Sequence, residues 1–254
     1  MEKEIMRTGF IDLDKIINLY EPKLIFLAGR PGMGKTTFAI NILANIGLKQ
    51  NISVLMLNLE ESKELIIDRI ISKETQVDIS KIKSKELNDL EKIKVQETRE
   101  LIENSKIFIE DTNISSLNKI IELIRKYVNE NNVRFIAIDY LQLIDFKSSS
   151  DKKIENILRQ LKQISKELKI TILITSQMSR TLLEREDKRP RITDLKNKKE
   201  IWNYADIIML LYRDECYNEN TEKKNIAELI IAKNDAGKKV ELVFDGNYSS
   251  FANI

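Results

Sequence analysis

The feature that most constrains this chain is a glycine-rich turn between a short apolar run and a segment of helical periodicity. Residues 29–36 read GRPGMGKT and satisfy the pattern GxxxxGK[ST]. The apolar run 23–29 before them has the composition of a buried strand, and residues 36–49 after them repeat apolar side chains at helical spacing. In that context glycines let backbone N–H groups turn inward around phosphate oxygens, and the helix N-terminus adds its positive end. The pattern therefore predicts a phosphate-binding loop.

Individual residues of this loop have distinct expected tasks. Lys35 is expected to reach the β- and γ-phosphates of a nucleotide, and the Thr36 hydroxyl is expected to bind Mg²⁺. The predicted nucleotide-binding residues are Gly29, Arg30, Pro31, Gly32, Met33, Gly34, Lys35, Thr36 and Thr37. The alternative is a glycine-rich turn that fits the pattern by chance, and the flanking strand and helix argue against it.

Short apolar runs rich in β-branched residues recur along the chain. The runs predicted as strands are 23–29, 52–58, 106–110, 134–139, 170–176, 206–212, 226–232 and 239–244. Most are nearly continuous in apolar residues, as expected of strands buried on both faces. Helical periodicity is found at 36–49, 61–72, 117–130 and 153–168, and Ser62 is a candidate N-cap.

The order of these segments predicts the fold class. Alternation of strand and helix implies right-handed crossovers, hence an α/β fold with a mainly parallel twisted sheet and helices on both faces. The last predicted strands follow one another without helices, so we expect antiparallel strands at the C-terminal end of the sheet. No internal repeat or domain boundary is evident, and residues 1–254 are predicted to form a single domain.

Polar side chains stand at or just beyond the ends of three predicted strands. Asp139 ends an apolar strand and would face the phosphate loop, where it could hold Mg²⁺ through a water or simply cap a loop. Glu60 and Glu61 follow another strand, and the spacing alone does not choose which of them is a general base. Gln177 suits sensing of a γ-phosphate, or satisfying backbone groups at a strand end.

Composition excludes several classes of protein. The chain has no histidine and a single cysteine, Cys216, which rules out a His/Cys zinc site and an intramolecular disulfide framework. Its 42 basic and 40 acidic residues give a net charge of +2, so any surface for nucleic acid must be local. No apolar run approaches the roughly 20 residues of a membrane span, and the N-terminus lacks the apolar core of a signal peptide. We therefore expect a cytoplasmic protein without a membrane partner.

Several segments, in this order, resemble the ATPase domain of DnaB-type replicative helicases. They are TGFIDL (8–13), AGRPGMGKT (28–36), NLEES (58–62), IDYLQLI (138–144), SQMSR (176–180), DKRPRITDL (187–195), ADIIMLLYRDE (205–215) and IAKN (231–234). The resemblance covers about residues 8–251, nearly the whole chain. It implies a RecA-like P-loop fold, hydrolysis of ATP with Mg²⁺ as cofactors, and movement on single-stranded DNA in replication. It also implies a homo-oligomer, a hexameric ring, and contacts with other replication proteins.

Carried over to this chain, the resemblance assigns roles to the residues singled out above. Lys35 and Thr36 would bind phosphate and metal, and Asp139 would be the metal partner. Glu60, rather than Glu61, would be the catalytic base, and Gln177 would be the γ-phosphate sensor.

The chain departs from the family pattern near its C-terminus. Family members carry an arginine finger where this chain has Asp235, and Lys233 remains two residues before it. Such a finger is typically worth about 10³–10⁵ in rate, and a carboxylate would repel the phosphate. We therefore expect Lys233 as a trans-acting candidate and inefficient hydrolysis between subunits, with Lys238 and Lys239 as nearby alternatives.

The segment that contacts DNA in the family has also changed. The family pattern resembles D-L-R-E-S-G, whereas residues 194–199 read DLKNKK. Lys196, Lys198 and Lys199 are predicted to contact the phosphates of single-stranded DNA, with a solvated loop as the alternative. Trp202 follows, and either stacks on a base or packs as a core or interface aromatic.

In the family an N-terminal helical domain and a linker helix precede this segment, whereas residues 1–7 stand there here. No N-terminal helical domain is therefore predicted, although a fragment of a longer protein would look the same. Three functions remain: a DNA motor, a partner-dependent ATPase that regulates a replication or repair complex, and a RecA-type recombination ATPase. The segments IDYLQLI and LYRDE argue against the third.

Overall fold

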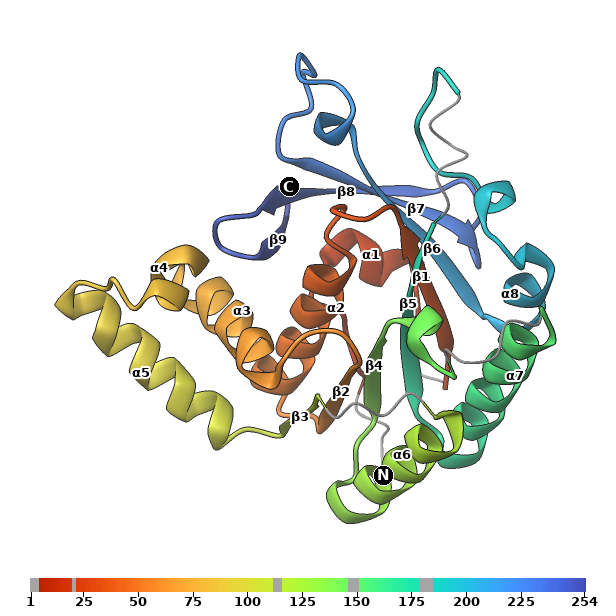
Figure 1. Ribbon diagram of the computed structural model, residues 1–254, viewed down its shortest axis with the longest axis horizontal. Helices are drawn as coiled ribbons and strands as arrows, with labels where there is room; N and C mark the ends of the chain where they lie inside the picture. The colour runs from red at the N-terminus through yellow and green to blue at the C-terminus, as the bar shows by residue number, and fades with distance from the viewer. Residues whose placement is uncertain (1–4, 20–21, 112–115, 146–150, 179–184) are drawn as a thin grey trace.

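Nine strands form the sheet at the centre of the structure, a computed structural model drawn in Figure 1. The structure describes residues 5–19, 22–111, 116–145, 151–178 and 185–254, so Ser179 and Arg180 of the segment 176–180 lie outside it, as do residues 1–4. The strands are β1 (Leu24–Gly29), β2 (Val54–Asn58), β3 (Ile107–Glu110), β4 (Phe135–Asp139), β5 (Thr171–Gln177), β6 (Ile207–Arg213), β7 (Ile226–Lys233), β8 (Lys239–Asp245) and β9 (Ser250–Asn253). They lie in the order β3-β2-β4-β5-β1-β6-β7-β8-β9.

The strand directions confirm the predicted fold class. Strands β1 to β6 pair in parallel, whereas β6 to β9 pair antiparallel at the C-terminal end. The pairing register places Gly29 beside Gln177 and Asn58 beside Asp139 at the carboxyl edge of the parallel strands. The short strand β9, which follows a turn, was not predicted.

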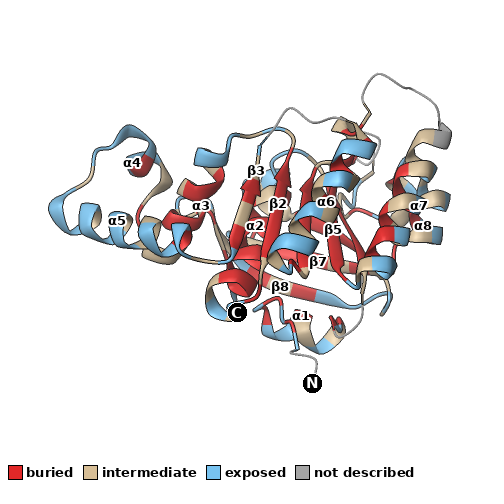
Figure 2. Cartoon of the chain, turned by 90° about the horizontal axis from the view of Figure 1, so that it is seen from below, coloured by how far each residue is buried: buried red, intermediate tan, exposed pale blue. Residues whose placement is uncertain are grey.

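Alternate residues of the parallel strands enter two hydrophobic cores, which explains the continuous apolar runs. In β1, Ile25 and Leu27 enter the first core, whereas Leu24 and Phe26 enter the second. Helices α1 (Ile11–Ile16), α2 (Lys35–Ala44) and α3 (Lys63–Thr75) contribute to the first core, and α6 (Leu117–Asn131), α7 (Asp151–Leu168) and α8 (Lys198–Tyr204) contribute to the second. Figure 2 shows the buried strands between helices whose outer faces are exposed.

The predicted helices are present. Helix α2 runs on into a π-helical turn, η1 (Asn45–Lys49), which completes the segment predicted at 36–49. The predicted N-cap of α3 is confirmed, because the Ser62 hydroxyl accepts a hydrogen bond from the Leu65 N–H at 3.4 Å. Within the described part of the chain, no helix combines the length and the apolar content that crossing a bilayer requires.

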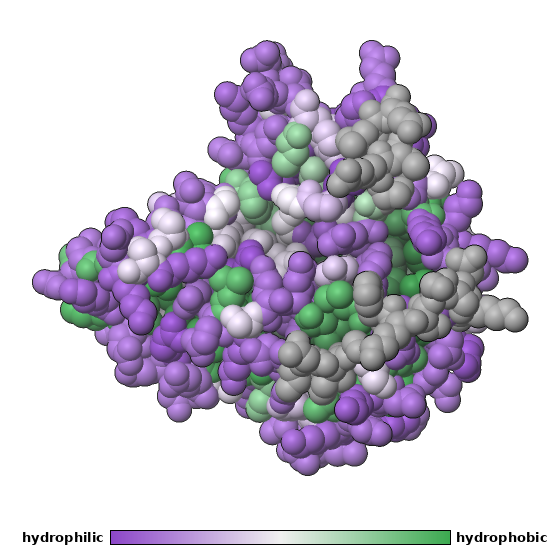
Figure 3. All heavy atoms as spheres, in the orientation of Figure 1, coloured by the Kyte–Doolittle hydropathy of each residue, from purple (hydrophilic) through white to green (hydrophobic). Residues whose placement is uncertain are grey.

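Two helices beyond α3 form an arm that was not predicted. They are α4 (Ile79–Ser84) and α5 (Asp89–Glu103). Helix α5 begins with a capping box, in which the side chains of Asn88 and Glu91 each accept from the other residue's backbone N–H. The exposed large apolar residues of α5 are Leu90, Ile93 and Leu101. Figure 3 shows hydrophobic atoms near the end of this arm on an otherwise mainly hydrophilic face.

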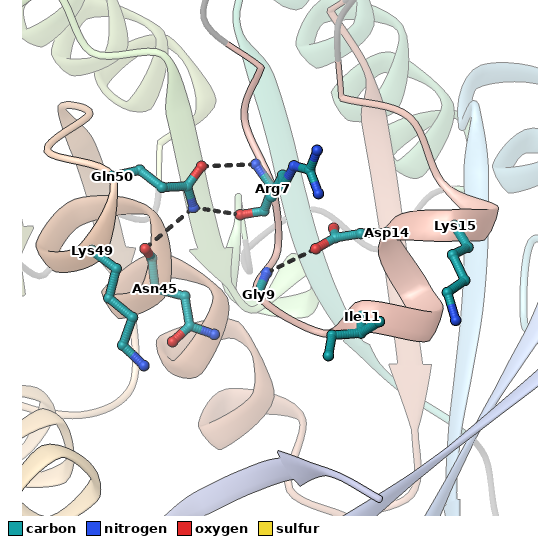
Figure 4. A pocket seen from close by; sticks show the side chains of 8 residues that line it. All are labelled: Arg7, Gly9, Ile11, Asp14, Lys15, Asn45, Lys49 and Gln50. Carbon is teal, nitrogen blue, oxygen red and sulfur yellow. Dashed lines mark hydrogen bonds between the residues drawn. The ribbon is translucent and has the colours of Figure 1, made fainter.

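The segment before β1 is fastened to the end of α2 (Figure 4). The Gln50 side chain bonds both backbone groups of Arg7, at 2.9 Å to the N–H and 2.7 Å to the carbonyl. The Asp14 carboxylate accepts from the Gly9 N–H at 3.1 Å. Gly9 has φ +85°, and a Cβ there would lie 2.4 Å from Nδ2 of Asn45, so this turn requires glycine. These residues border a pocket of about 380 Å³.

At the antiparallel end, three cations surround one buried carboxylate. Glu228 is 1% exposed, and its oxygens lie 2.7 Å from Nε of Arg189, 3.0 Å from Nζ of Lys223 and 3.2 Å from Nζ of Lys239. We call these four residues the Glu228 cluster. Burial raises the pKa of Glu228, but the hydrogen bonds from the three cations outweigh it and lower the pKa to about 2.

Candidate active site

The phosphate loop joins β1 to α2 at the carboxyl edge of the sheet. Gly34 has φ +95°, and a Cβ there would lie 2.9 Å from Cζ of Phe251, so both the backbone conformation and the space require glycine. Because Gly34 carries no side chain to cap α2, the backbone N–H groups of the first turn remain available to a ligand. The loop therefore has the geometry of an anion site.

Lys35 is a buried cation that is poorly compensated by the chain itself. Lys35 is only 8% exposed, and its Nζ donates a hydrogen bond to the Arg30 carbonyl oxygen at 3.0 Å. Burial lowers the pKa of Lys35 to about 8, although the carboxylates of Asp139 and Glu60 act in the opposite direction. A phosphate chain would supply the missing counter-charge.

Asp139 and Thr36 lie in direct contact. The Thr36 hydroxyl donates to Oδ2 of Asp139 at 2.6 Å, and the Thr175 hydroxyl donates to Oδ1. Asp139 is 2% exposed. A hydroxyl and a carboxylate side by side at the mouth of a phosphate loop are oxygen donors of the kind that Mg²⁺ prefers, so these residues fit the predicted ion.

The loop after β2 separates the two candidate bases. The Asn58 side chain accepts from the backbone N–H groups of both Glu60 and Glu61 at 3.1 Å. Glu60 lines the cleft beside the phosphate loop, whereas Glu61 pairs with Arg69 at 2.5 Å. Burial, followed by the carboxylates of Asp139 and Glu61, raises the pKa of Glu60. A carboxylate with a raised pKa at the cleft is suited to accepting a proton.

Gln177 is held at the cleft by a residue that the sequence reading did not single out. The Gln142 amide donates to the Ser176 hydroxyl at 2.8 Å and to the Gln177 carbonyl at 3.2 Å. Its oxygen accepts from the Gln177 N–H at 3.3 Å. The Gln177 backbone is therefore fixed from the segment that follows Asp139, and Gln177 itself lines the cleft.

Lys35, Thr36, Glu60 and Gln177 line one cleft of about 360 Å³, whereas Asp139 is not among its lining residues and contacts it through Thr36. Its lining residues are Pro31, Gly32, Gly34, Lys35, Thr36, Thr37, Glu60, Arg69, Gln177, Phe244, Gly246 and Ser249. Arg69 and the residues from β8 to β9 were not predicted. The Arg213 guanidinium lies 3.7 Å from the centroid of the Phe244 ring and donates to the Gly32 carbonyl at 3.2 Å, so the C-terminal strands reach the phosphate loop.

The predicted DNA-contacting lysines lie apart from this cleft. Lys196, Lys198 and Lys199 are all outside its lining; Lys198 and Lys199 begin α8, and Lys196 lies two residues before it. Asn197 between them has φ +61°, a left-handed conformation that asparagine tolerates better than most residues. The segment thus adopts a left-handed conformation at Asn197, two residues before the position where the family pattern has glycine.

The predicted trans-acting residue is engaged within the chain. Nζ of Lys233 donates to the carbonyl oxygens of Trp202 at 2.5 Å and Ala205 at 2.6 Å, and lies 5.3 Å from the Trp202 ring centroid. Trp202 is 45% exposed, so it is not a core residue. Asp235 forms an ion pair with Lys238. The structure does not bring Lys233 or Asp235 into the cleft.

Fold and cleft together define a RecA-like P-loop core. The DnaB-like helicase C terminal domain family matches residues 6–253, and this chain belongs to that family. It is 39% identical to the replicative DNA helicase DnaB of Buchnera aphidicola subsp. Baizongia pistaciae, over 98% of this chain and 55% of the relative. It is 34% identical to the replicative DNA helicase DnaB of Geobacillus stearothermophilus, over 97% of this chain and 56% of the relative.

Solved structures agree with this assignment. One solved ATPase domain matches with a TM-score of 0.90 and 33% identity, over 100% of this chain and 93% of that one. A DnaB-like replicative helicase, whose structure was described with its interactions with primase, matches with a TM-score of 0.90 and 34% identity. That match covers 98% of this chain and 62% of the other. The chain spans about half the length of the curated relatives it matches.

Proposed function

We propose that this chain binds and hydrolyses ATP with Mg²⁺ and couples hydrolysis to single-stranded DNA, as the motor domain of a replicative helicase. The observation that carries the proposal is the single cleft that gathers Lys35, Glu60 and Gln177 beside the contact between Thr36 and Asp139. A cation, a base candidate and an amide at one anion-binding loop form a set suited to phosphoryl transfer.

Each residue has a task in this proposal. Lys35 and the loop N–H groups hold the β- and γ-phosphates, and Thr36 and Asp139 hold Mg²⁺. When bound, Mg²⁺ would neutralise charge that develops on the phosphate oxygens. Glu60 orients the attacking water and accepts its proton, which its raised pKa favours. Gln177, fixed by Gln142, reports the presence of the γ-phosphate.

The DNA side of the proposal rests on three lysines just before and at the start of α8, Lys196, Lys198 and Lys199. Ammonium groups contact phosphates without reading sequence, which suits a translocating protein. Family membership supports a homo-oligomer, a hexameric ring that holds the strand, and contacts with other replication proteins. Membership of this family also favours the DNA motor over a RecA-type recombination ATPase.

A second candidate is a partner-dependent ATPase that regulates a replication or repair complex without acting as a motor. It is favoured by Asp235, a carboxylate at the position of the family's arginine finger, and by Lys233, which is bound to α8 and the residue after it. Trans-acting charge stabilisation would then come from a different chain.

Steady-state ATP turnover, measured with and without single-stranded DNA while particle mass is recorded, separates the two candidates. Lys35→Ala is the control for turnover at this cleft. The motor requires strong stimulation by DNA together with a six-fold particle mass. Nucleotide binding with negligible turnover in a monomer, unchanged by DNA, contradicts the motor and leaves the partner-dependent ATPase.

A further inference from the structure

Arg69 extends from α3 into the cleft, although no motif marks it. Its Nη1 donates to the Thr37 hydroxyl at 3.2 Å, and its Nη2 donates to Oε1 of Glu61 at 2.5 Å. The side chain is 21% exposed and lines the cleft together with Glu60. One guanidinium therefore joins the first turn of α2 to the loop that carries the candidate base.

That loop, residues 59–62, is anchored at each end. At the β2 end, the Leu59 N–H donates to the Asp139 carbonyl at 2.8 Å, and Asn58 accepts from the two glutamate N–H groups. At the α3 end, Ser62 caps the helix. In the middle of the loop, the ion pair with Arg69 fixes Glu61, whereas Glu60 lines the cleft.

The ion pair is not arranged for greatest stability. Among the described residues, Nε of Arg69 and Oε2 of Glu61 are buried without a hydrogen-bond partner. An arginine and a carboxylate bond most strongly when both pairs of atoms engage, and unpaired buried atoms cost free energy. Incomplete pairing of this kind calls for an explanation other than stability, such as a role in the site.

Charge gives the pair a second effect on the cleft. Glu60, Glu61 and Asp139 bring three carboxylates together at the carboxyl edge, and Glu60 is affected by both of the others. The Arg69 cation lies on Glu61 and offsets one of these negative charges. Arg69 thus holds Glu61 away from the position that Glu60 occupies.

We propose that Arg69 is a positioning residue for Glu60, which it orients through Glu61 and Thr37 by fixing the loop 59–62 against α2. This inference rests on the proposed function, because it requires that Glu60 act in ATP hydrolysis. Arg69 itself touches neither water nor phosphate in this role.

The expected kinetic signature follows from geometry. A misplacement of about 1 Å at a reacting centre can cost about 100-fold in rate, so Arg69→Gln should lower kcat by about 10- to 100-fold. KM for ATP should stay within about threefold, since the phosphate contacts come from the loop of Gly34 and Lys35. Arg69→Lys keeps the charge but lacks the fork that reaches two partners, and should recover only part of the loss.

The test is a double-mutant cycle with Glu60→Gln in the full chain, read by single-turnover hydrolysis of Mg-ATP. Once Glu60 is replaced there is no base to position, so Arg69→Gln should change the rate by less than about twofold in that background. Arg125→Gln is the matched control, because Arg125 on α6 forms an ion pair with Glu167 on α7, outside the cleft. It should leave turnover unchanged.

The outcomes separate cleanly. Equal losses from Arg69→Gln in both backgrounds, or a raised KM with unchanged kcat, overturn the positioning role. If Arg69→Gln does not fold, Glu61→Gln replaces it in the cycle, and an unchanged kcat for Glu61→Gln overturns the role as well. Turnover that does not depend on Glu60 overturns the proposed function, and this inference with it. Additive losses together with Glu60-dependent turnover reject only the inference.

Discussion

Two buried charges in different parts of the molecule, Lys35 and Glu228, differ in how far the chain itself compensates them. Lys35, at the carboxyl edge of the parallel strands, is buried with its amine bonded to a carbonyl oxygen, and burial lowers its pKa to about 8. Glu228, at the antiparallel end, is buried under three cations that lower its pKa to about 2. The first charge awaits a counter-charge from a ligand, whereas the second is fully paired by the chain itself. Burial alone therefore does not mark a functional residue, but burial with poor compensation does.

The largest effect is expected at Lys35. Lys35→Ala should weaken binding of Mg-ATP by about 100-fold or more, because a buried charge contact to phosphate is lost. The thermal midpoint of the chain without nucleotide should not fall, since among the described residues this amine forms no ion pair and only donates to a carbonyl oxygen. Fluorescence titration with a nucleotide analogue and a thermal melt measure the two quantities. A lower midpoint with unchanged affinity would assign Lys35 to the fold instead.

In the unsubstituted chain, nucleotide binding should cause Lys35 to take up a proton. Free Lys35 is half neutral near pH 8, and a bound phosphate favours its charged form and raises its pKa. Binding should therefore take up protons between about pH 8 and pH 10, and calorimetry in buffers of different ionisation enthalpy measures that uptake. The Lys35→Ala chain is the control.

Glu228→Gln should lower the stability of the fold and leave nucleotide affinity unchanged, the reverse of the effects expected for Lys35→Ala. The pKa of Glu228 falls from 4.5 to about 2 on folding, which corresponds to a stabilisation of on the order of 3 kcal/mol. A depressed carboxylate pKa stabilises the fold above pH 4.5, and that contribution is lost as pH falls from 4.5 toward 2. Urea unfolding at pH 7 and pH 3 should show a large difference between the two chains at pH 7 and a smaller one at pH 3. Nucleotide affinity should not change, and a change would contradict the separation of the two regions.

Lys196, Lys198 and Lys199 carry charges that belong neither to the cleft nor to the Glu228 cluster. Replacing Lys196, Lys198 and Lys199 together by alanine should lower the salt dependence of single-stranded DNA binding by about 2 in log–log slope, at about 0.7 per phosphate contact. The matched control replaces Lys83, Lys92 and Lys94 of the α4–α5 arm. Identical slopes for both triple variants would show that Lys196, Lys198 and Lys199 do not contact the DNA.

The smallest effect is expected at Asp235. Asp235→Arg should raise ATP turnover by about tenfold, well below the full value of an arginine finger, and make turnover depend on chain concentration. Asp235→Asn is the control, since it removes the carboxylate without supplying a cation. Equal rates for both variants would mean that only repulsion had been relieved.

The sequence predicted those parts of the cleft that stand at strand ends. Lys35, Asp139 and Gln177 each follow a readable apolar run, and parallel pairing brings such ends to one edge. Spacing did not separate Glu60 from Glu61, because the difference lies in the partner that Glu61 finds on α3.

The remainder of the cleft depends on contacts between distant parts of the chain. Arg69 is one of many cations on helices, and only the fold places it on Thr37. Phe244 ends a predicted strand, but no local signal shows that the antiparallel strands bring it to the phosphate loop. Helix α5 is different, because the capping box of Asn88 and Glu91 is a readable start signal.

The most direct test of the account compares single-turnover hydrolysis of saturating Mg-ATP by the unsubstituted chain and by Glu60→Gln. Glu60 is proposed as the base at the cleft, so the substitution should lower the rate by about 10²- to 10⁴-fold while the nucleotide still binds. Equal rates in the two chains would contradict the assignment of this cleft as a site of hydrolysis that depends on Glu60.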